Sequence, residues 1–335
     1  MRNDASGVLV LPAAFEGRLQ GLRDEIEDPR AGLFGPASMM WRVQREAGVF
    51  LGAGAALLLQ TAHPFVAQGI ADHSNALADP LARYYRTFRP VFAMVFGSAD
   101  EAFVAAKRVR GVHARIRGTF PEAVGSWPAG SAYAADDADA LFWVHATLWH
   151  TSIAVYERLV APLSATDKDM YTRESARFGA LFGIPDAALS RRWQDFAACF
   201  DAVAASDALG VGSAGHLIGN YFVGDTRGSF GRLLPKWYRS LTASLLPPRL
   251  AQAFELPSVT TEEVERLWRR LRAFRQALPP FLRYVGPYQM AQCRVAGRKP
   301  GLVARLVNHV WLGGTPSPRW GEGTSDGAGT TPAGS

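Results

Sequence analysis

Apolar residues recur every three to four positions through most of the 335-residue chain, and few segments alternate apolar and polar residues as a half-buried strand does. This pattern predicts an all-α fold, a single globular multi-helix domain. The most apolar run, residues 48–60, has about 13 residues, whereas a helix needs roughly 20 to cross a bilayer. We interpret it as part of a buried helix over 39–59, with its glycines marking close helix packing, and expect no transmembrane segment.

Prolines and glycines divide the middle of the chain. Pro64 fits the first turn of a short helix that begins after a break in the preceding one. The next helix is predicted over 79–89, and Pro90 is expected to close it because proline cannot continue a helical hydrogen-bond ladder. Residues 125–135 are rich in Gly, Pro and Ser, which predicts a loop.

Capping residues predict where three later helices begin. Ser98 opens a Ser-Ala-Asp-Glu capping box, and the helix after it is expected to end at Gly118. Asp136 or Asp137 should cap a strongly apolar helix, and Ser164 should cap the next.

The chain divides into three parts by composition. Residues 1–30 are interpreted as an N-terminal extension and 31–312 as one catalytic domain, because no linker interrupts the helical pattern. Residues 313–335 contain mostly Gly, Pro, Ser and Thr, which predicts a disordered tail.

Charge and cysteine content narrow the function classes. The formal net charge is +6, but no long basic run, zinc finger or helix-turn-helix signature indicates a nucleic-acid partner. The two cysteines, Cys199 and Cys293, cannot form a disulfide framework or a four-thiolate site. With no signal-peptide pattern at the N-terminus, we expect a cytoplasmic protein. A peripheral membrane contact through 302–312 stays open, and nothing in the sequence indicates the oligomeric state.

Two histidines stand near the middle of the expected apolar helices, His113 and His145. A neutral imidazole is a common ligand of haem iron and other metals. By helical spacing, Val109, Ile116 and Arg117 would share the face of His113, a setting that suits a flat apolar ligand with carboxylate edges. Spacing alone favours the plainer interpretation for both histidines, a core side chain bonded to a backbone carbonyl.

A polar group lies in the predicted helix over 79–89. Arg83 and Thr87 are four residues apart, so both would lie on one helical face, with Arg86 beside them. They could orient dioxygen, a substrate oxygen or a propionate, or they could form a solvated basic face. No zinc-protease, nucleophile-elbow, phosphate-loop or dinucleotide motif is present in the sequence.

Four segments in fixed order resemble one family. They are REAGVFLGAGAALLLQTAHPFVAQGIADHS, ADPLARYYRTFRPVFAMVFG, RVRGVHARIRG and YAADDADALFWVHATLWHTSIAVYERL. Together they are similar to the catalytic domain of the MpaB and rubber oxygenase family. That family includes the latex clearing proteins, which cleave polyisoprene oxidatively, and a fungal oxygenase of the mycophenolic acid pathway.

The resemblance implies an all-helical fold, haem b as cofactor and specific site residues. His113 corresponds to the proximal iron ligand, and Arg83 with Thr87 to part of the distal pocket. Arg86 stands where the latex clearing proteins have a lysine, which argues against a lysine-assisted rubber cleavage, because Arg cannot donate a proton near neutral pH. His145 corresponds to a second histidine of the family near the pocket.

The resemblance makes a haem-dependent oxygenase the first hypothesis, with iron held by His113 and dioxygen and a hydrophobic small molecule as substrates. Arg86 and Arg117 are further candidates for cofactor contact, and Arg83 and Thr87 for the catalytic face. Two alternatives remain: a non-enzymatic haem protein that binds or senses gas, and a helical lipid-binding protein that has lost haem. An absorption spectrum of the pure protein would separate the last from the other two.

Overall fold

The computed structural model describes residues 9–74, 79–224 and 229–314, and the chain there is mostly helical. Residues 315–335 of the predicted tail lie outside the described residues. The α-helices are α1 (Pro12–Asp24), α2 (Met39–Gln44), α3 (Ala53–Thr61), α4 (Pro64–His73), α5 (Pro80–Phe96), α6 (Ala99–His113), α7 (Ala138–Leu159), α8 (Ala165–Ala180), α9 (Trp193–Ala205), α10 (Ser213–Phe222), α11 (Lys236–Ser244), α12 (Pro248–Ala253), α13 (Thr261–Ala277), α14 (Pro280–Arg283), α15 (Gly286–Val295) and α16 (Leu302–Leu312). Three short 3-10 helices, η1 (Ala47–Gly52), η2 (Asp186–Ala188) and η3 (Phe230–Leu233), and two strands, β1 (Arg117–Thr119) and β2 (Ala132–Ala134), complete the described elements.

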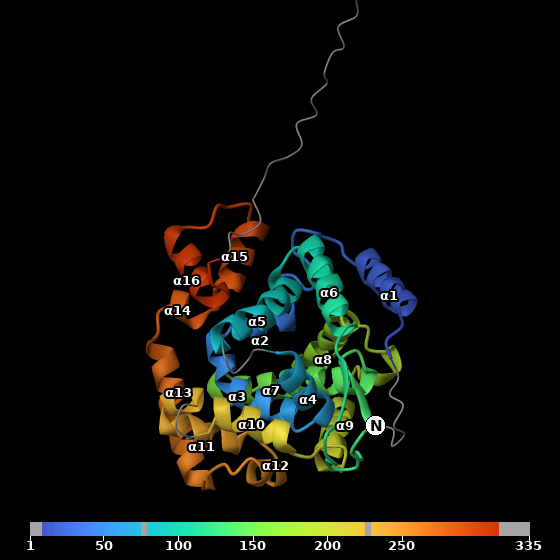
Figure 1. Cartoon of the computed structure of the whole chain (residues 1–335). Helices are drawn as coiled ribbons and strands as arrows, with labels where there is room; N and C mark the ends of the chain where they lie inside the picture. The colour runs from blue at the N-terminus through green and yellow to red at the C-terminus, as the bar shows by residue number, and fades with distance from the viewer. Residues whose placement is uncertain (1–8, 75–78, 225–228, 315–335) are drawn as a thin grey trace, which may run out of the picture.

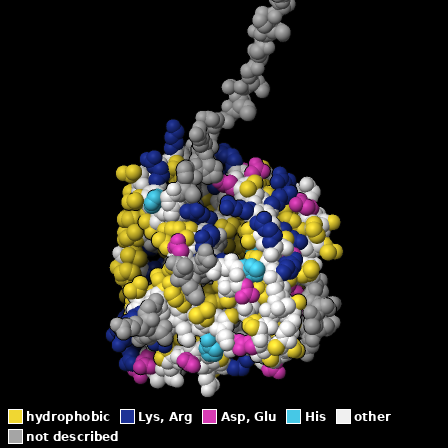
Figure 2. All heavy atoms as spheres, viewed as in Figure 1, with side chains coloured by type: hydrophobic (Ala, Val, Ile, Leu, Met, Phe, Trp, Pro, Cys, Tyr) yellow, Lys and Arg dark blue, Asp and Glu magenta, His cyan; other side chains and the backbone are white. Residues whose placement is uncertain are grey.

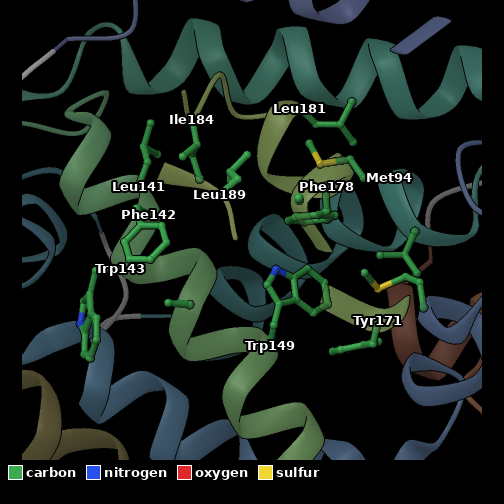
Figure 3. Close-up of a cluster of buried hydrophobic side chains, with 14 of the residues drawn as sticks. Met94, Leu141, Phe142, Trp143, Trp149, Tyr171, Phe178, Leu181, Ile184 and Leu189 are labelled. Carbon is green, nitrogen blue, oxygen red and sulfur yellow. The ribbon is translucent and has the colours of Figure 1, made fainter. Parts of the chain in front are cut away.

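Helix α7 passes through the middle of the molecule, with α3, α8 and α9 around it (Figure 1). Most of its side chains are buried, which explains why its sequence is apolar on nearly every face. Trp143 and Trp149 come from α7, and Tyr171 and Phe178 from α8, in the buried cluster of Figure 3. The indole N–H of Trp143 donates to the carbonyl of Leu59 at 2.7 Å, so the core packing also satisfies a buried donor.

The expected helix over 39–59 is broken into α2, η1 and α3, which corrects the prediction. Glu46 lies at the break and is buried, and its carboxylate pairs with Arg275 of α13 at 2.8 Å. The glycine interpretation is confirmed: a Cβ on Gly48 would overlap Leu159, and one on Gly52 would overlap Thr151, both on α7. The break lets a buried carboxylate find its partner, while the glycines bring η1 close against α7.

Helix α5 continues through Pro90 to Phe96, although Pro90 was expected to end it. Phe88, Phe92 and Phe96 repeat every four residues and pack into the core, with Phe92 and Phe96 buried. Burying this stripe outweighs the one hydrogen bond that a proline removes.

The all-α prediction also needs a correction, because β1 and β2 form a small antiparallel sheet with Gly118 opposite Tyr133. Gly118 was expected to cap a helix, but α6 ends earlier, at His113. A Cβ at Gly118 would overlap the ring of Tyr133, which is buried and donates its hydroxyl to Asp72 at 2.6 Å. The glycine therefore serves a close aromatic contact, which helical periodicity does not reveal.

The N-terminal part adds to the core, since Phe15, Leu19 and Leu22 of α1 are buried. Among the described residues, no single helix is long and apolar enough to cross a membrane. The neighbouring segments Ala47–Thr61 and Pro64–His73 are together long and apolar enough to do so, but the chain bends by 100° between them.

Candidate functional site

Arg83 and His113 lie at the far ends of two helices that share one turn. Ser98 caps α6: its hydroxyl accepts from the Glu101 amide, and the Glu101 carboxylate accepts from the Ser98 amide, so this predicted capping box is confirmed. Helices α5 and α6 diverge from the turn at Gly97 and Ser98 (Figure 1). Arg83 and His113 are close enough for the guanidinium charge to act on the imidazole.

His113 is the last residue of α6, not a mid-helix residue as expected from the sequence. Ile116 and Arg117 therefore do not continue its helical face. The pKa of His113 is lowered to about 4, mainly by burial, with Asp136 raising it and the charges of Arg83 and Arg110 lowering it. The imidazole is thus neutral at physiological pH, and its ring forms no hydrogen bond with any side chain or backbone group of the described residues.

A buried carboxylate holds the chain on both sides of His113. The side chain of Asp136 is almost fully buried and pairs with Arg110 and Arg117, each at 2.7 Å. Burial alone would raise the pKa of Asp136, but the hydrogen bond from Arg110 and the charges of both guanidiniums hold it below its usual value. Because Arg110 precedes His113 in α6 and Arg117 follows it in β1, this bridge fixes the direction in which the chain leaves the helix.

Arg83 is partly buried on α5, and burial together with the charge of Arg86 lowers its pKa. No carboxylate within 9–74, 79–224 or 229–314 pairs with it. Arg86 and Thr87 are exposed, and the helical course of α5 confirms that Arg83 and Thr87 share a face. A partly buried cation without a counter-charge is suited to an anionic or strongly polarised oxygen ligand.

The donor set limits the kind of metal centre that the site could hold. The described residues contain no group of three or more His, Cys, Asp or Glu side chains placed to bind one metal ion. Haem iron needs only one or two protein ligands, because the porphyrin supplies four nitrogens. A single neutral imidazole at His113 therefore fits haem better than it fits a metal held by protein ligands alone.

Residues 41–277 match the family described as ER-bound oxygenase mpaB/B'/rubber oxygenase, catalytic domain, and this stretch is more than half of the chain. The chain belongs to this family. The resemblance of the four ordered segments is thereby confirmed. None of the curated proteins and none of the solved structures compared with the chain matches it.

His145, the other histidine predicted near the pocket, lies in the core on α7. It is 4% exposed, and its Nε2 lies 2.7 Å from the Ser175 carbonyl, which makes Nε2 the protonated nitrogen. Burial lowers its pKa to about 4, and its Nδ1 is buried without a hydrogen-bond partner in the described structure. Of the predicted site residues, Arg83 acts on His113 through its charge, and His145 lies in the core beside Trp149.

Sequence reasoning missed one residue of the site, Asp136. Two consecutive acids precede α7, and either could have been its cap. Asp137 is the cap, accepting from the Ala140 amide at 2.9 Å. A helix needs only one capping side chain. The second acid could therefore have been predicted to form another interaction, which is its ion pairs with Arg110 and Arg117. Arg117 was a candidate for cofactor contact. Its guanidinium forms this ion pair with Asp136 and donates a hydrogen bond to the carbonyl of Ile116.

Proposed function

We propose that this chain is a haem b-dependent oxygenase that acts on a hydrophobic small molecule, with His113 as the protein ligand of the iron. The observation that carries the proposal is a neutral imidazole at the end of α6 that lies within range of the charge of Arg83 on α5. Among the described residues, the His113 ring has no hydrogen-bond partner and the partly buried guanidinium of Arg83 has no carboxylate partner. Membership in a family of oxygenase catalytic domains supports it.

When bound, haem b would supply the iron-centred chemistry of oxygen activation. The chain's own contribution begins with His113, which can offer a nitrogen lone pair because its pKa of about 4 keeps it unprotonated at neutral pH. The bridge of Asp136 to Arg110 and Arg117 orients the backbone on both sides of that ligand.

Arg83 and Thr87 would bind and orient oxygen atoms on the facing side. The guanidinium of Arg83 donates several hydrogen bonds in a fixed plane and stays charged, so it can hold a polarised oxygen or a carboxylate without giving up a proton. Arg86 also stays charged and cannot give up a proton near neutral pH. A mechanism that needs a lysine as proton donor therefore does not suit this chain. Any proton delivered to oxygen must then come from water or another group.

The absorption spectrum of the purified protein, expressed with haem supply, tests the proposal. We expect a Soret band in the wild type and its loss or displacement in His113→Ala. His309→Ala is the matched control, because His309 is exposed on α16 and should leave the spectrum unchanged. A spectrum unaltered by His113→Ala would refute the ligand assignment.

Oxygen consumption separates an oxygenase from a haem protein that only binds or senses gas. With apolar alkene or lipid-like substrates, the wild type should consume dioxygen, and Arg83→Ala should slow this while the Soret band is retained. Haem binding without consumption for any such substrate would favour the non-enzymatic alternative.

A further inference from the structure

Helix α16 exposes a row of apolar side chains that do not pack against the rest of the described structure. Leu302, Leu306 and Val310 repeat every four residues and are 75%, 64% and 65% exposed, with Val303 beside them at 52%. An apolar row normally faces a core, and here it faces outward.

The opposite face of α16 already anchors the helix to the domain. The ring of Trp311 lies against Phe50 with centroids 4.7 Å apart, and the backbone of Asn308 lies so close to Gly286 that a Cβ there would overlap it. Arg89 of α5 donates to the carbonyl of Leu312 at 2.6 Å. The helix is therefore fixed in place, and its outer apolar row is a surface feature.

Neighbouring segments extend this apolar surface. Phe281 and Leu282 of α14 are exposed, and α14 lies against α16. Figure 2 shows hydrophobic side chains gathered along the left edge of the molecule, over α16 and α14. We call Phe281, Leu282, Leu302, Leu306 and Val310 the apolar ridge. It lies beyond residue 277, where the family match ends.

The segment of the chain that carries the apolar ridge has charges of one sign. Residues 266–314 contain ten Arg and Lys and no Asp or Glu. Arg298, Lys299 and Arg305 are exposed, and none of them pairs with a carboxylate of the described residues. By helical spacing, Arg305 stands at one edge of the apolar row of α16, where its long side chain can keep its charge in water while its stem covers apolar surface.

We propose that the apolar ridge and these three basic residues dock the protein on the surface of an anionic lipid membrane. An exposed apolar row edged by cations, with no acidic side chain near it in sequence, complements lipid headgroups and the acyl boundary beneath them. A second copy of the chain would bring the same positive charge against itself, which disfavours self-association through this face. The proposal does not depend on haem or on catalysis.

Vesicle flotation with full-length protein tests the docking surface. We expect the wild type to float with phosphatidylcholine vesicles that contain phosphatidylserine, to bind much less to phosphatidylcholine alone, and to be released by high salt. Arg298→Glu with Lys299→Glu should weaken binding by roughly 25-fold or more, because each basic residue near an anionic surface contributes about fivefold. Leu302→Ser with Leu306→Ser should weaken it by about tenfold or more.

Two control variants match these changes elsewhere on the surface. Val104→Ser with Leu233→Ser removes two exposed apolar side chains, and Arg108→Glu with Arg173→Glu reverses two exposed charges. Both should bind like the wild type, and circular dichroism should show that all variants are folded. Failure of the wild type to bind anionic vesicles, or equal losses in ridge and control variants, would overturn the proposal. So would a dimer in light scattering that dissociates in Leu302→Ser with Leu306→Ser, which would assign the face to a second copy.

Discussion

Replacing Asp136 with Asn would test whether the buried ion-pair bridge holds the end of α6 in place. The substitution keeps the size of the side chain but removes its charge, so Arg110 and Arg117 lose their shared carboxylate. The imidazole of His113 lies between these two arginines in the chain and is not itself altered. The variant therefore tests whether Asp136 positions the end of α6, without changing the proposed iron ligand His113.

The expected cost follows from the burial of the three groups. Breaking a fully buried ion pair by removing one partner costs about 3–5 kcal/mol, whereas an exposed pair contributes about 0–1 kcal/mol. The side chain of Asp136 is 4% exposed, that of Arg110 13% and that of Arg117 41%, so Arg117 can regain water and Arg110 only partly. We expect a loss of about 2–3 kcal/mol in the free energy of unfolding at pH 7.

Urea unfolding followed by circular dichroism measures this loss. Glu16→Gln is the control, because its ion pair with Lys107 is similarly short at 2.8 Å but both side chains are more than half exposed. It should cost about 0.5 kcal/mol or less. The pKa of Asp136 is lowered in the folded state, so its contribution is present above pH about 4 and is lost as the pH falls further. Equal costs for the two variants, or a cost for Asp136→Asn that survives in acid, would refute the reasoning.

Three further predictions concern the core and the turns. His145 has a pKa of about 4 in the folded protein and about 6.5 unfolded, so between pH 7 and pH 5 the wild type should lose about 2 kcal/mol of unfolding free energy relative to His145→Gln, whose amide can still donate to the Ser175 carbonyl. A pH-independent difference between the two in urea titrations would contradict the buried neutral histidine. Gly32→Ala should destabilise the fold by more than about 1 kcal/mol, because Gly32 has φ +81° and its Cβ would meet the carbonyl of Gly97; a thermal midpoint equal to the wild type would argue against this. Ser98→Ala should cost about 1 kcal/mol in urea unfolding through loss of the α6 cap, with no change expected in Ser98→Asp.

Helix starts were predictable from the sequence because capping is local. Ser98, Asp137 and Ser164 each accept a hydrogen bond from an amide three residues later, as their spacing predicts. Pro64 likewise begins α4, because its missing N–H costs nothing in a first turn.

Helix ends and interruptions were not predictable in the same way, because distant partners decide them. The chain leaves α6 after His113 to place Arg117 on Asp136, which lies in another segment. The break before η1 serves the pair of Glu46 with Arg275, more than two hundred residues away. Helix α5 continues through Pro90 because Phe88, Phe92 and Phe96 pack into the core, and that packing depends on the tertiary fold. In each case the partner lies in a distant part of the chain, so local spacing alone does not predict the contact.

The proximity of Arg83 to His113 is an intermediate case, since the sequence holds enough to predict it once the turn is identified. The capping box marks the turn at Gly97 and Ser98. Arg83 precedes Gly97 by 14 residues and His113 follows Ser98 by 15, so at 1.5 Å rise per residue the two lie about equally far from the turn. Two motifs that look unrelated along the chain are thus the matched ends of one helical hairpin. It follows that a single residue inserted in either helix should rotate one of them by about 100° and separate the pair, while leaving the capping box intact.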